Sequence, residues 1–193
     1  YVLLRDDFNV QIVDGQITDA FRIEQSMPTI NALRAGGARI AIVAHRGRPK
    51  GVRNMEYTLA PIAQYMGVKL VPDCLDKDFM ADMHDGDVVL LENVRFYGAD
   101  EKNDPAFSAD LARGYDLFVN DAFAVSHRAH ASTVGVAEIL PSYAGLLLAS
   151  EIENLSQVME NPKRPLLSIV AGSKVSTKIG VLKALAKLSD TLI

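Results

Sequence analysis

The stretch Ile40-Ala41-Ile42-Val43-Ala44-His45-Arg46-Gly47-Arg48-Pro49-Lys50-Gly51 decides the fold that we expect for this chain. Its first four residues form an unbroken apolar run, which is typical of a strand buried on both faces of a parallel sheet. Directly after this run the chain presents an imidazole, two guanidinium groups and an ammonium group. Glycine and proline at 47, 49 and 51 oppose a helix, so a fixed basic loop is predicted at the strand end.

The chemistry of this loop indicates an anion site. Guanidinium groups are planar and permanently charged, and they match the oxygen atoms of phosphates and carboxylates. In open α/β sheets, ligands bind beyond the carboxyl ends of the strands. The alternative interpretation is a solvated basic loop, because charged side chains mostly lie on protein surfaces.

Composition narrows the possible function classes. The chain has 193 residues, of which 49% are hydrophobic and 23% charged, which suits one domain plus part of another. A net charge of −4 argues against nucleic-acid binding, so an anion site requires local clustering of cations. The single cysteine, Cys74, excludes an internal disulfide and a cysteine-based zinc site. No signal peptide and no membrane-spanning apolar run is found, so no membrane partner is expected.

Apolar runs and helical patterns alternate along the chain. The runs predict strands at 2–4, 39–43, 68–71, 87–91, 115–119 and 166–170, and the patterns predict helices at 22–33, 58–66, 105–113, 144–159 and 175–188. This alternation predicts an α/β fold with an open, mainly parallel sheet and helices on both faces, a Rossmann-like three-layer arrangement. The helix at 144–159 suits a bridge between two domains, and both ends of the sequence look cut from a longer chain.

Positive side chains repeatedly follow the apolar runs, and parallel strands bring such positions to one edge of the sheet. These side chains are Arg5, His45, Arg48, Arg95, Arg128 and Lys174. They are predicted to form one basic face, which is what a small polyanion needs. Taken singly, each could be a solvated or ion-paired surface residue.

Two further histidines, His127 and His130, lack the acidic partners of a metal site.

Other phosphate and catalytic motifs are missing or weak. The sequence has no P-loop, no dinucleotide fingerprint, no nucleophile elbow and no zinc-protease motif. Gly172-Ser173-Lys174 lies at a predicted strand-to-helix junction, where free backbone N–H groups favour anions. Lys178 follows four residues later on the same face of that helix.

Six spaced motifs resemble the phosphoglycerate kinase family, in the family's order and along essentially the whole chain. They are Asp7-Phe8-Asn9-Val10, Asp19-Ala20-Phe21-Arg22-Ile23, His45-Arg46-Gly47-Arg48-Pro49, Leu91-Glu92-Asn93-Val94-Arg95-Phe96, the segment from Asn120 to His130, and Gly172-Ser173-Lys174-Val175-Ser176-Thr177-Lys178. The resemblance implies the N-terminal domain of a two-domain hinge kinase. It places the phosphoglycerate-binding domain at 1–143, an interdomain helix at 144–161 and the start of a nucleotide-binding domain at 162–193.

The resemblance also implies an activity and a set of site residues. The reaction is the glycolytic, reversible phosphoryl transfer from 1,3-bisphosphoglycerate to ADP, which gives 3-phosphoglycerate and ATP. Arg22 and Lys174 would stabilise the transferring phosphoryl group, and Lys178 would contact the nucleotide. Mg²⁺ would arrive with ATP or ADP, bound mainly by the C-terminal domain, with no metal ligand in this chain. A cytoplasmic monomer is expected. Substrate would be held by Asp7, Asn9, Arg22, His45, Arg48, Arg95 and Arg128.

The sequence departs from the family pattern at a few positions without removing an expected ligand. Asp6 stands at a position that usually carries a small apolar residue, and Arg46 replaces an apolar residue of the loop, so the two are expected to pair. Gln11, Ala124 and Ala171 replace a usual proline and two usual glycines. Because transfer requires two domains to close on the substrates, we expect weak phosphoglycerate binding and negligible turnover from these residues alone.

Two further interpretations stay open at this point. A non-catalytic α/β module would keep the basic face to bind phosphate or another anion. A structural fragment would keep only the sheet, with the rest of its core supplied elsewhere.

Overall fold

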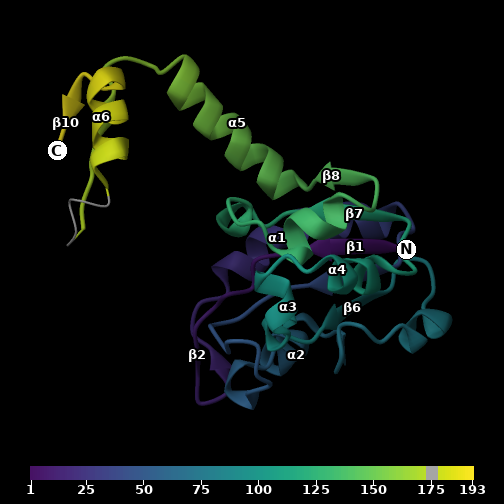
Figure 1. The fold of residues 1–193 in the computed structure, drawn as a ribbon. Helices are drawn as coiled ribbons and strands as arrows, with labels where there is room; N and C mark the ends of the chain where they lie inside the picture. Colours follow the sequence, from purple (N-terminus) through teal and green to yellow (C-terminus); the bar gives the residue numbers. More distant parts are fainter. Residues whose placement is uncertain (173–177) are drawn as a thin grey trace. The chain divides into compact units, whose positions relative to one another are not determined.

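The computed structural model describes residues 1–172 and 178–193. The chain divides into two compact units, Tyr1–Ala149 and Ser150–Ile193, which are described separately below. Figure 1 shows the elements of both units along the chain.

A six-stranded sheet forms the centre of the first unit, and all its paired strands are parallel. The sheet order is β5-β6-β4-β1-β7-β8, so β1 lies between β4 and β7, which are far apart in the sequence. The predicted parallel α/β sheet is thereby confirmed. Its strands are β1 (Val2–Arg5), β4 (Ile40–Val43), β5 (Lys69–Val71), β6 (Val88–Leu91), β7 (Leu117–Asn120) and β8 (Ser142–Ala144).

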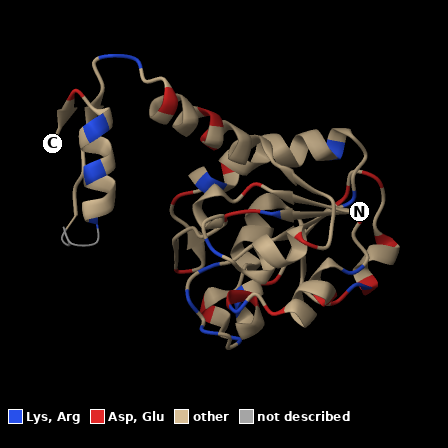
Figure 2. Ribbon diagram, turned by 45° about the horizontal axis from the view of Figure 1, so that its top comes forward, with Lys and Arg blue, Asp and Glu red and all other residues tan. Residues whose placement is uncertain are grey.

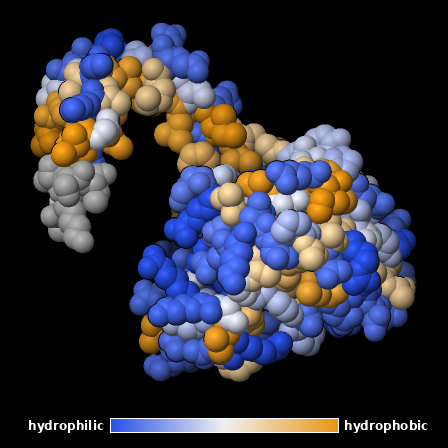
Figure 3. Space-filling model, viewed as in Figure 1, coloured by the Kyte–Doolittle hydropathy of each residue, from blue (hydrophilic) through white to orange (hydrophobic). Residues whose placement is uncertain are grey.

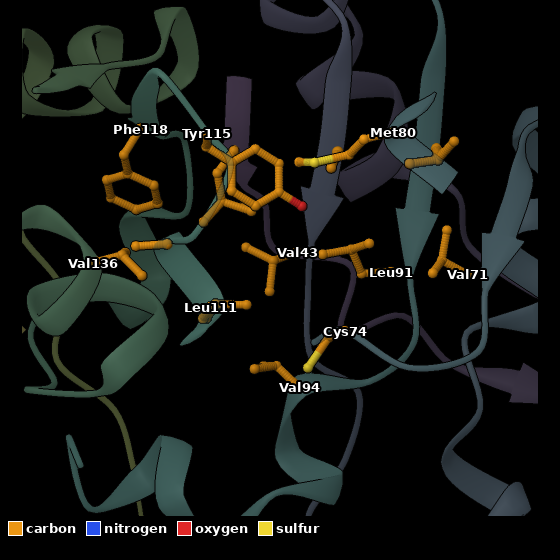
Figure 4. Packing of buried hydrophobic residues seen from close by; sticks show 14 of the residues in the cluster. Val43, Val71, Cys74, Met80, Leu91, Val94, Leu111, Tyr115, Phe118 and Val136 are labelled. Carbon is orange, nitrogen blue, oxygen red and sulfur yellow. The ribbon is translucent and has the colours of Figure 1, made fainter. Parts of the chain in front are cut away.

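Helices cover both faces of the sheet, because alternate residues of each buried strand point to opposite sides. On one face Leu4 and Ile42 pack with residues of α1 (Phe21–Ala35) and α2 (Ala60–Met66). On the other face Leu3 and Val43 pack with α4 (Pro105–Ala112) and the single turn η5 (Ala131–Gly135). Figure 4 shows this second layer, where side chains from several strands and α4 meet. The three-layer prediction is confirmed.

Local signals in the sequence explain where several helices begin and end. The Asp104 carboxylate accepts a hydrogen bond from the Phe107 N–H at 2.9 Å, and Pro105 follows at the first helical position of α4. Gly67 ends α2 in the left-handed conformation, with φ of 66°, which glycine adopts without strain.

Short elements complete the first unit. The Asp14-Gly15 turn joins β2 (Ile12–Val13) to β3 (Gln16–Ile17) in an antiparallel hairpin. The remaining short helical segments are η1 (Met55–Tyr57), η2 (Asp78–Asp82), η3 (Val94–Phe96), α3 (Gly98–Glu101) and η4 (Phe123–Val125).

The start of the long helix differs from the prediction. Ala144 does not begin a helix but ends the edge strand β8, where it pairs with Asn120. Helix α5 runs from Leu146 to Glu160. Its first turn is fixed by side chains of the first unit, because the Leu146 N–H donates to Thr29 Oγ1 and the Leu148 N–H to Asp121 Oδ1, both at 2.9 Å. The helix therefore begins only after the chain has left the sheet.

The second unit contains most of α5, the strands β9 (Leu167–Ser168) and β10 (Thr191–Leu192), and α6 (Ile179–Leu188). The predicted strand at 166–170 is shorter than expected, because its partner β10 has only two residues in register with it. The beginning of the predicted helix at 175–188 lies outside the described residues. Figure 3 shows apolar residues on the surface of α5. The exposed apolar side chains of this helix include Ile152, Leu155 and Met159.

Candidate anion-binding site at the strand ends

A small cavity of about 210 Å³ lies at the carboxyl edge of the sheet in the first unit. The parallel register explains its position, because Arg5 at the end of β1 is level with Val43 of β4 and Asn120 of β7. The loops after these strands therefore leave the sheet at the same edge, as expected for a ligand site of an open α/β sheet. The lining consists of Asp7, Asn9, Arg22, His45, Gly47, Arg48, Arg95, Ala124, Val125 and Arg128.

All seven residues predicted to hold the substrate line this cavity. Four of them are arginines and one, Asp7, is a carboxylate, so the lining is strongly basic in a chain of net charge −4. Figure 2 shows acidic and basic residues interspersed along the ribbon, so the basic cavity is a local cluster. The geometry brings the residues together; their roles toward a ligand stay predictions.

Asn9, Asn93 and Arg95 fix the basic loop after β4 by binding its backbone. The Gly47 N–H donates to Asn9 Oδ1, and the Arg95 guanidinium donates to the Gly47 carbonyl, both at 2.9 Å. The Asn93 amide donates to the Arg46 carbonyl at 2.8 Å and to the Tyr57 carbonyl at 2.9 Å. Two cavity residues thus also hold the loop that carries His45 and Arg48.

Gly47 allows the loop to pass close to an aromatic ring. Its φ is 64°, and a Cβ added there would lie 2.2 Å from Cδ1 of Tyr57. Gly67 has nearly the same φ, 66°, with nothing within 4 Å of a Cβ. We expect Gly67→Ala to lower the free energy of unfolding by about 1 kcal/mol through backbone strain. Gly47→Ala should lower it by about 1–2 kcal/mol more, because Tyr57 must move.

Denaturant unfolding of both glycine variants measures this difference. Since Gly67→Ala carries the strain without the clash, it is the matched control. An equal loss of unfolding free energy in the two variants would show that the contact of Gly47 with the Tyr57 ring does not constrain the loop.

Arg22 reaches the cavity from the first turn of α1, where it forms an ion pair with Asp7. The Asp7 carboxylate also accepts the Asn9 N–H at 3.2 Å, so it orients both neighbours. Placement at strand ends did not select Arg22, because it lies on a helix; only the family motif identified it.

His45 is buried behind the exposed arginines, with 3% of its surface accessible. Its Nδ1 lies 3.1 Å from Nη2 of Arg5. Burial and the neighbouring Arg5, Arg95, His130 and Arg128 lower the pKa of His45 to about 2, so the imidazole is neutral.

Arg5, which was selected by its place after a strand, does not line the cavity, and neither do His127 and His130. Arg5 is buried beneath it, with 1% of its surface exposed. His130 is also buried and lies 3.9 Å from the carboxylate of Asp100. His127 accepts a hydrogen bond from Nε of Arg128 at 3.3 Å and so orients a cavity residue.

The expected pairing of Asp6 with Arg46 is wrong. Asp6 is fully buried, and its carboxylate accepts a hydrogen bond from the Ser26 hydroxyl of α1. Arg46 instead donates to the backbone carbonyls of Glu56 and Thr58. The pKa of Asp6 is raised to about 7. Burial is the largest cause of this shift, and the nearby Asp121 contributes in the same direction.

The predicted nucleotide contacts belong to the second unit. Lys174 lies outside the described residues. Lys178 directly precedes α6, and its ammonium group donates to the Ala171 carbonyl at 2.6 Å.

Within residues 1–172 and 178–193, no three His, Cys, Asp or Glu side chains are grouped to hold a metal ion. The same part of the chain has no helix that is both long and apolar enough to cross a membrane.

The parallel sheet and the arginine-lined cavity at its strand ends define a class: α/β domains with a basic cavity at the carboxyl edge of the sheet, which is where open α/β sheets bind their ligands. Comparison with known proteins narrows this class to one family. The family model described as "Phosphoglycerate kinase" matches residues 1–193, so the chain belongs to the phosphoglycerate kinase family.

Individual relatives agree with this assignment. The chain is 48% identical over 200 residues to the phosphoglycerate kinase of Borrelia garinii subsp. bavariensis, covering 99% of this chain and 51% of the relative. It is 50% identical over 201 residues to that of Sinorhizobium fredii, covering 100% and 50%. The solved phosphoglycerate kinase structure from Coxiella burnetii has a TM-score of 0.88 at 41% identity, covering 99% and 50%. The chain thus spans about half the length of these relatives.

Proposed function

We propose that this chain provides the phosphoglycerate site of a phosphoglycerate kinase, which transfers a phosphoryl group reversibly between 1,3-bisphosphoglycerate and ADP. The observation that carries the proposal is the convergence of four arginines, one neutral histidine, Asp7 and Asn9 on one cavity. Its volume of about 210 Å³ is below the range typical of drug-sized ligands and suits a three-carbon phosphate.

The chain's own residues act by positioning and charge. In the proposed complex, Arg48, Arg95 and Arg128 hold the phosphate and carboxylate oxygens through charge-assisted hydrogen bonds. Arg22, already oriented by Asp7, stabilises negative charge on the transferring phosphoryl group. Phosphoryl transfer needs such placement more than a covalent nucleophile, and the chain offers it on short loops fixed by Asn9 and Asn93.

The nucleotide side of the reaction belongs to the same proposal. Residues 162–193 would begin the nucleotide-binding domain, with Lys174 on the transferring group and Lys178 on the nucleotide phosphates. Mg²⁺ would enter as part of its complex with ATP or ADP, which is a substrate. A monomeric state and a cytoplasmic location complete the proposal.

Calorimetric titration with 3-phosphoglycerate and a coupled phosphoryl-transfer assay test the proposal together. The 193-residue chain should bind 3-phosphoglycerate at the cavity more tightly than sulfate, yet give negligible turnover, since transfer requires closure on both substrates. The full-length Borrelia garinii relative, assayed in parallel, is the control for activity.

The outcomes separate the alternatives. No preference for 3-phosphoglycerate over sulfate would favour a general anion-binding module. No binding of either anion would favour a structural fragment. Turnover by the 193-residue chain at the rate of the full-length relative would contradict the proposal that these residues alone bind the substrate without completing the transfer.

A further inference from the structure

Arg5 lies beneath the candidate site and makes hydrogen bonds in several directions. Its Nε donates to Ser132 Oγ at 3.2 Å, and Nη1 donates to the Asp6 carbonyl and, at 3.5 Å, to the Val43 carbonyl. Its Nη2 lies 3.1 Å from Nδ1 of His45. The guanidinium is therefore held in one orientation by the ends of β1 and β4 and by η5.

This contact determines which nitrogen of His45 carries the proton. A guanidinium has only N–H donors and cannot accept a hydrogen bond. The contact therefore requires Nδ1 of His45 to be the acceptor, and the single proton of the neutral ring lies on Nε2. His45 lines the cavity, so this Nε2–H is the hydrogen-bond donor that the ring can offer to an anion.

The surroundings of His45 exclude a second proton. Arg5 faces it from β1, Arg95 from η3, and Arg128 and His130 from the segment before η5. Together with burial, these groups lower the pKa of His45 to about 2. Burial lowers the pKa of Arg5, while the nearby Asp100, Asp7 and Asp6 oppose this shift and favour its charged form.

We propose that Arg5 is a positioning residue for His45: its buried guanidinium fixes the tautomer of the neutral imidazole, with the proton on Nε2 and directed to an anion in the cavity. Arg5 itself touches no ligand. The role in ligand binding rests on the proposed phosphoglycerate site, whereas the protonation state of His45 does not depend on it.

The proposal has a consequence for pH dependence. A histidine with its ordinary pKa near 6.5 changes its charge between pH 5 and 8, and its affinity for an anion changes accordingly. The His45 held by Arg5 contributes the same neutral donor throughout this range. Changes of affinity with pH then come from the phosphate of the ligand, whose second pKa is about 6, and from Asp6 beside Arg5, whose pKa burial raises to about 7.

A ¹H–¹⁵N spectrum of the histidine rings tests the protonation state in the ligand-free chain. The chain has four histidines, and the signals that disappear in His45→Gln are those of His45. We expect one neutral ring with the proton on Nε2 from pH 5 to 8. A proton on Nδ1, or a ring that titrates within this range, would overturn the proposal.

Binding of 3-phosphoglycerate at several pH values tests the role of Arg5. Arg5→Met removes the donor to Nδ1 and the nearest positive charge, so we expect about tenfold weaker binding than wild type at pH 8. The ring spectrum of Arg5→Met should place the proton of His45 partly on Nδ1, because that nitrogen has lost its donor while burial still keeps the ring neutral. Taking the ratio of the two affinities at each pH removes the titration of the ligand itself.

The double variant Arg5→Met/His45→Gln separates this mechanism from loss of structure. Glutamine has no tautomers, so Arg5→Met should weaken binding less in the His45→Gln background than in wild type. An equal loss of affinity in both backgrounds, with an unchanged His45 ring spectrum in Arg5→Met, would reject the positioning role.

Ser132→Ala provides a milder perturbation if Arg5→Met does not fold. It removes only the Nε contact, and we expect a smaller shift in the same direction; no change in either the ring spectrum or the affinity ratio would count against the proposal. Failure of wild type to bind 3-phosphoglycerate would reject the proposed function, while the ring spectrum would still decide the state of His45.

Discussion

The variant Arg48→Ala/Arg128→Ala is expected to bind 3-phosphoglycerate about 10²- to 10⁴-fold more weakly than wild type. Each lost hydrogen bond between charged groups costs about 1.5–3 kcal/mol, which gives about 3–6 kcal/mol for the pair if the two contacts are independent. Both arginines line the cavity, Arg48 exposed and Arg128 half-buried, so their removal leaves the core intact. Calorimetric titration of the two single variants and the double variant measures the effect.

Lys50→Gln is the matched control for this experiment. Lys50 lies on the same loop as Arg48 and is exposed, but it does not line the cavity. The variant should therefore keep wild-type affinity although it loses one positive charge near the site. Unchanged affinity in both arginine variants would reject the cavity as the binding site. A loss of affinity in Lys50→Gln equal to that in the single arginine variants would indicate a long-range effect of charge.

The second large effect concerns the buried Asp6 carboxyl and the dependence of stability on pH. The ordinary pKa of 3.8 applies to the unfolded chain, and burial raises the pKa of Asp6 in the folded state to about 7. Between these values the unfolded state releases a proton that the folded state keeps, so stability falls as pH rises from about 4 to 7. The full penalty, about 4 kcal/mol, applies above pH 7.

Asp6→Asn should remove this penalty, because asparagine is uncharged and its amide oxygen can still accept from Ser26. We expect the variant to be about 4 kcal/mol more stable than wild type at pH 8, with a difference that shrinks toward zero near pH 4. Denaturant unfolding at several pH values measures both. Asp14→Asn removes a charge from an exposed turn and is the control. If the free energies of unfolding of Asp6→Asn and wild type differ by the same amount at all pH values, Asp6 does not titrate as proposed.

Much of the fold follows from local pattern, because the apolar runs at 40–43 and 88–91 are long enough to identify buried strands. The site residues after these strands follow too, since parallel register brings strand ends together. The strand β8 was missed because its residues are exposed and form no apolar run, so only its pairing with β7 defines it.

Contacts between distant residues could not be predicted in this way. The partner of Asp6 is Ser26 on α1, a choice made by the packing of that helix on the sheet rather than by charge. Arg5 was correctly expected at the strand end, but its burial and its contact with His45 depend on the side on which its side chain leaves the strand. Such information appears only when the tertiary structure is known.

Cys74 provides a chemical probe for all of these variants. It is the only cysteine of the chain, and it is fully buried in the core cluster that includes Val43 and Leu91 (Figure 4). Burial also raises the pKa of its thiol, so the reactive thiolate is suppressed in the folded state. A thiol reagent can therefore label the protein only after this core opens. The labelling rate reports that opening at a single, naturally occurring atom, without an added fluorophore.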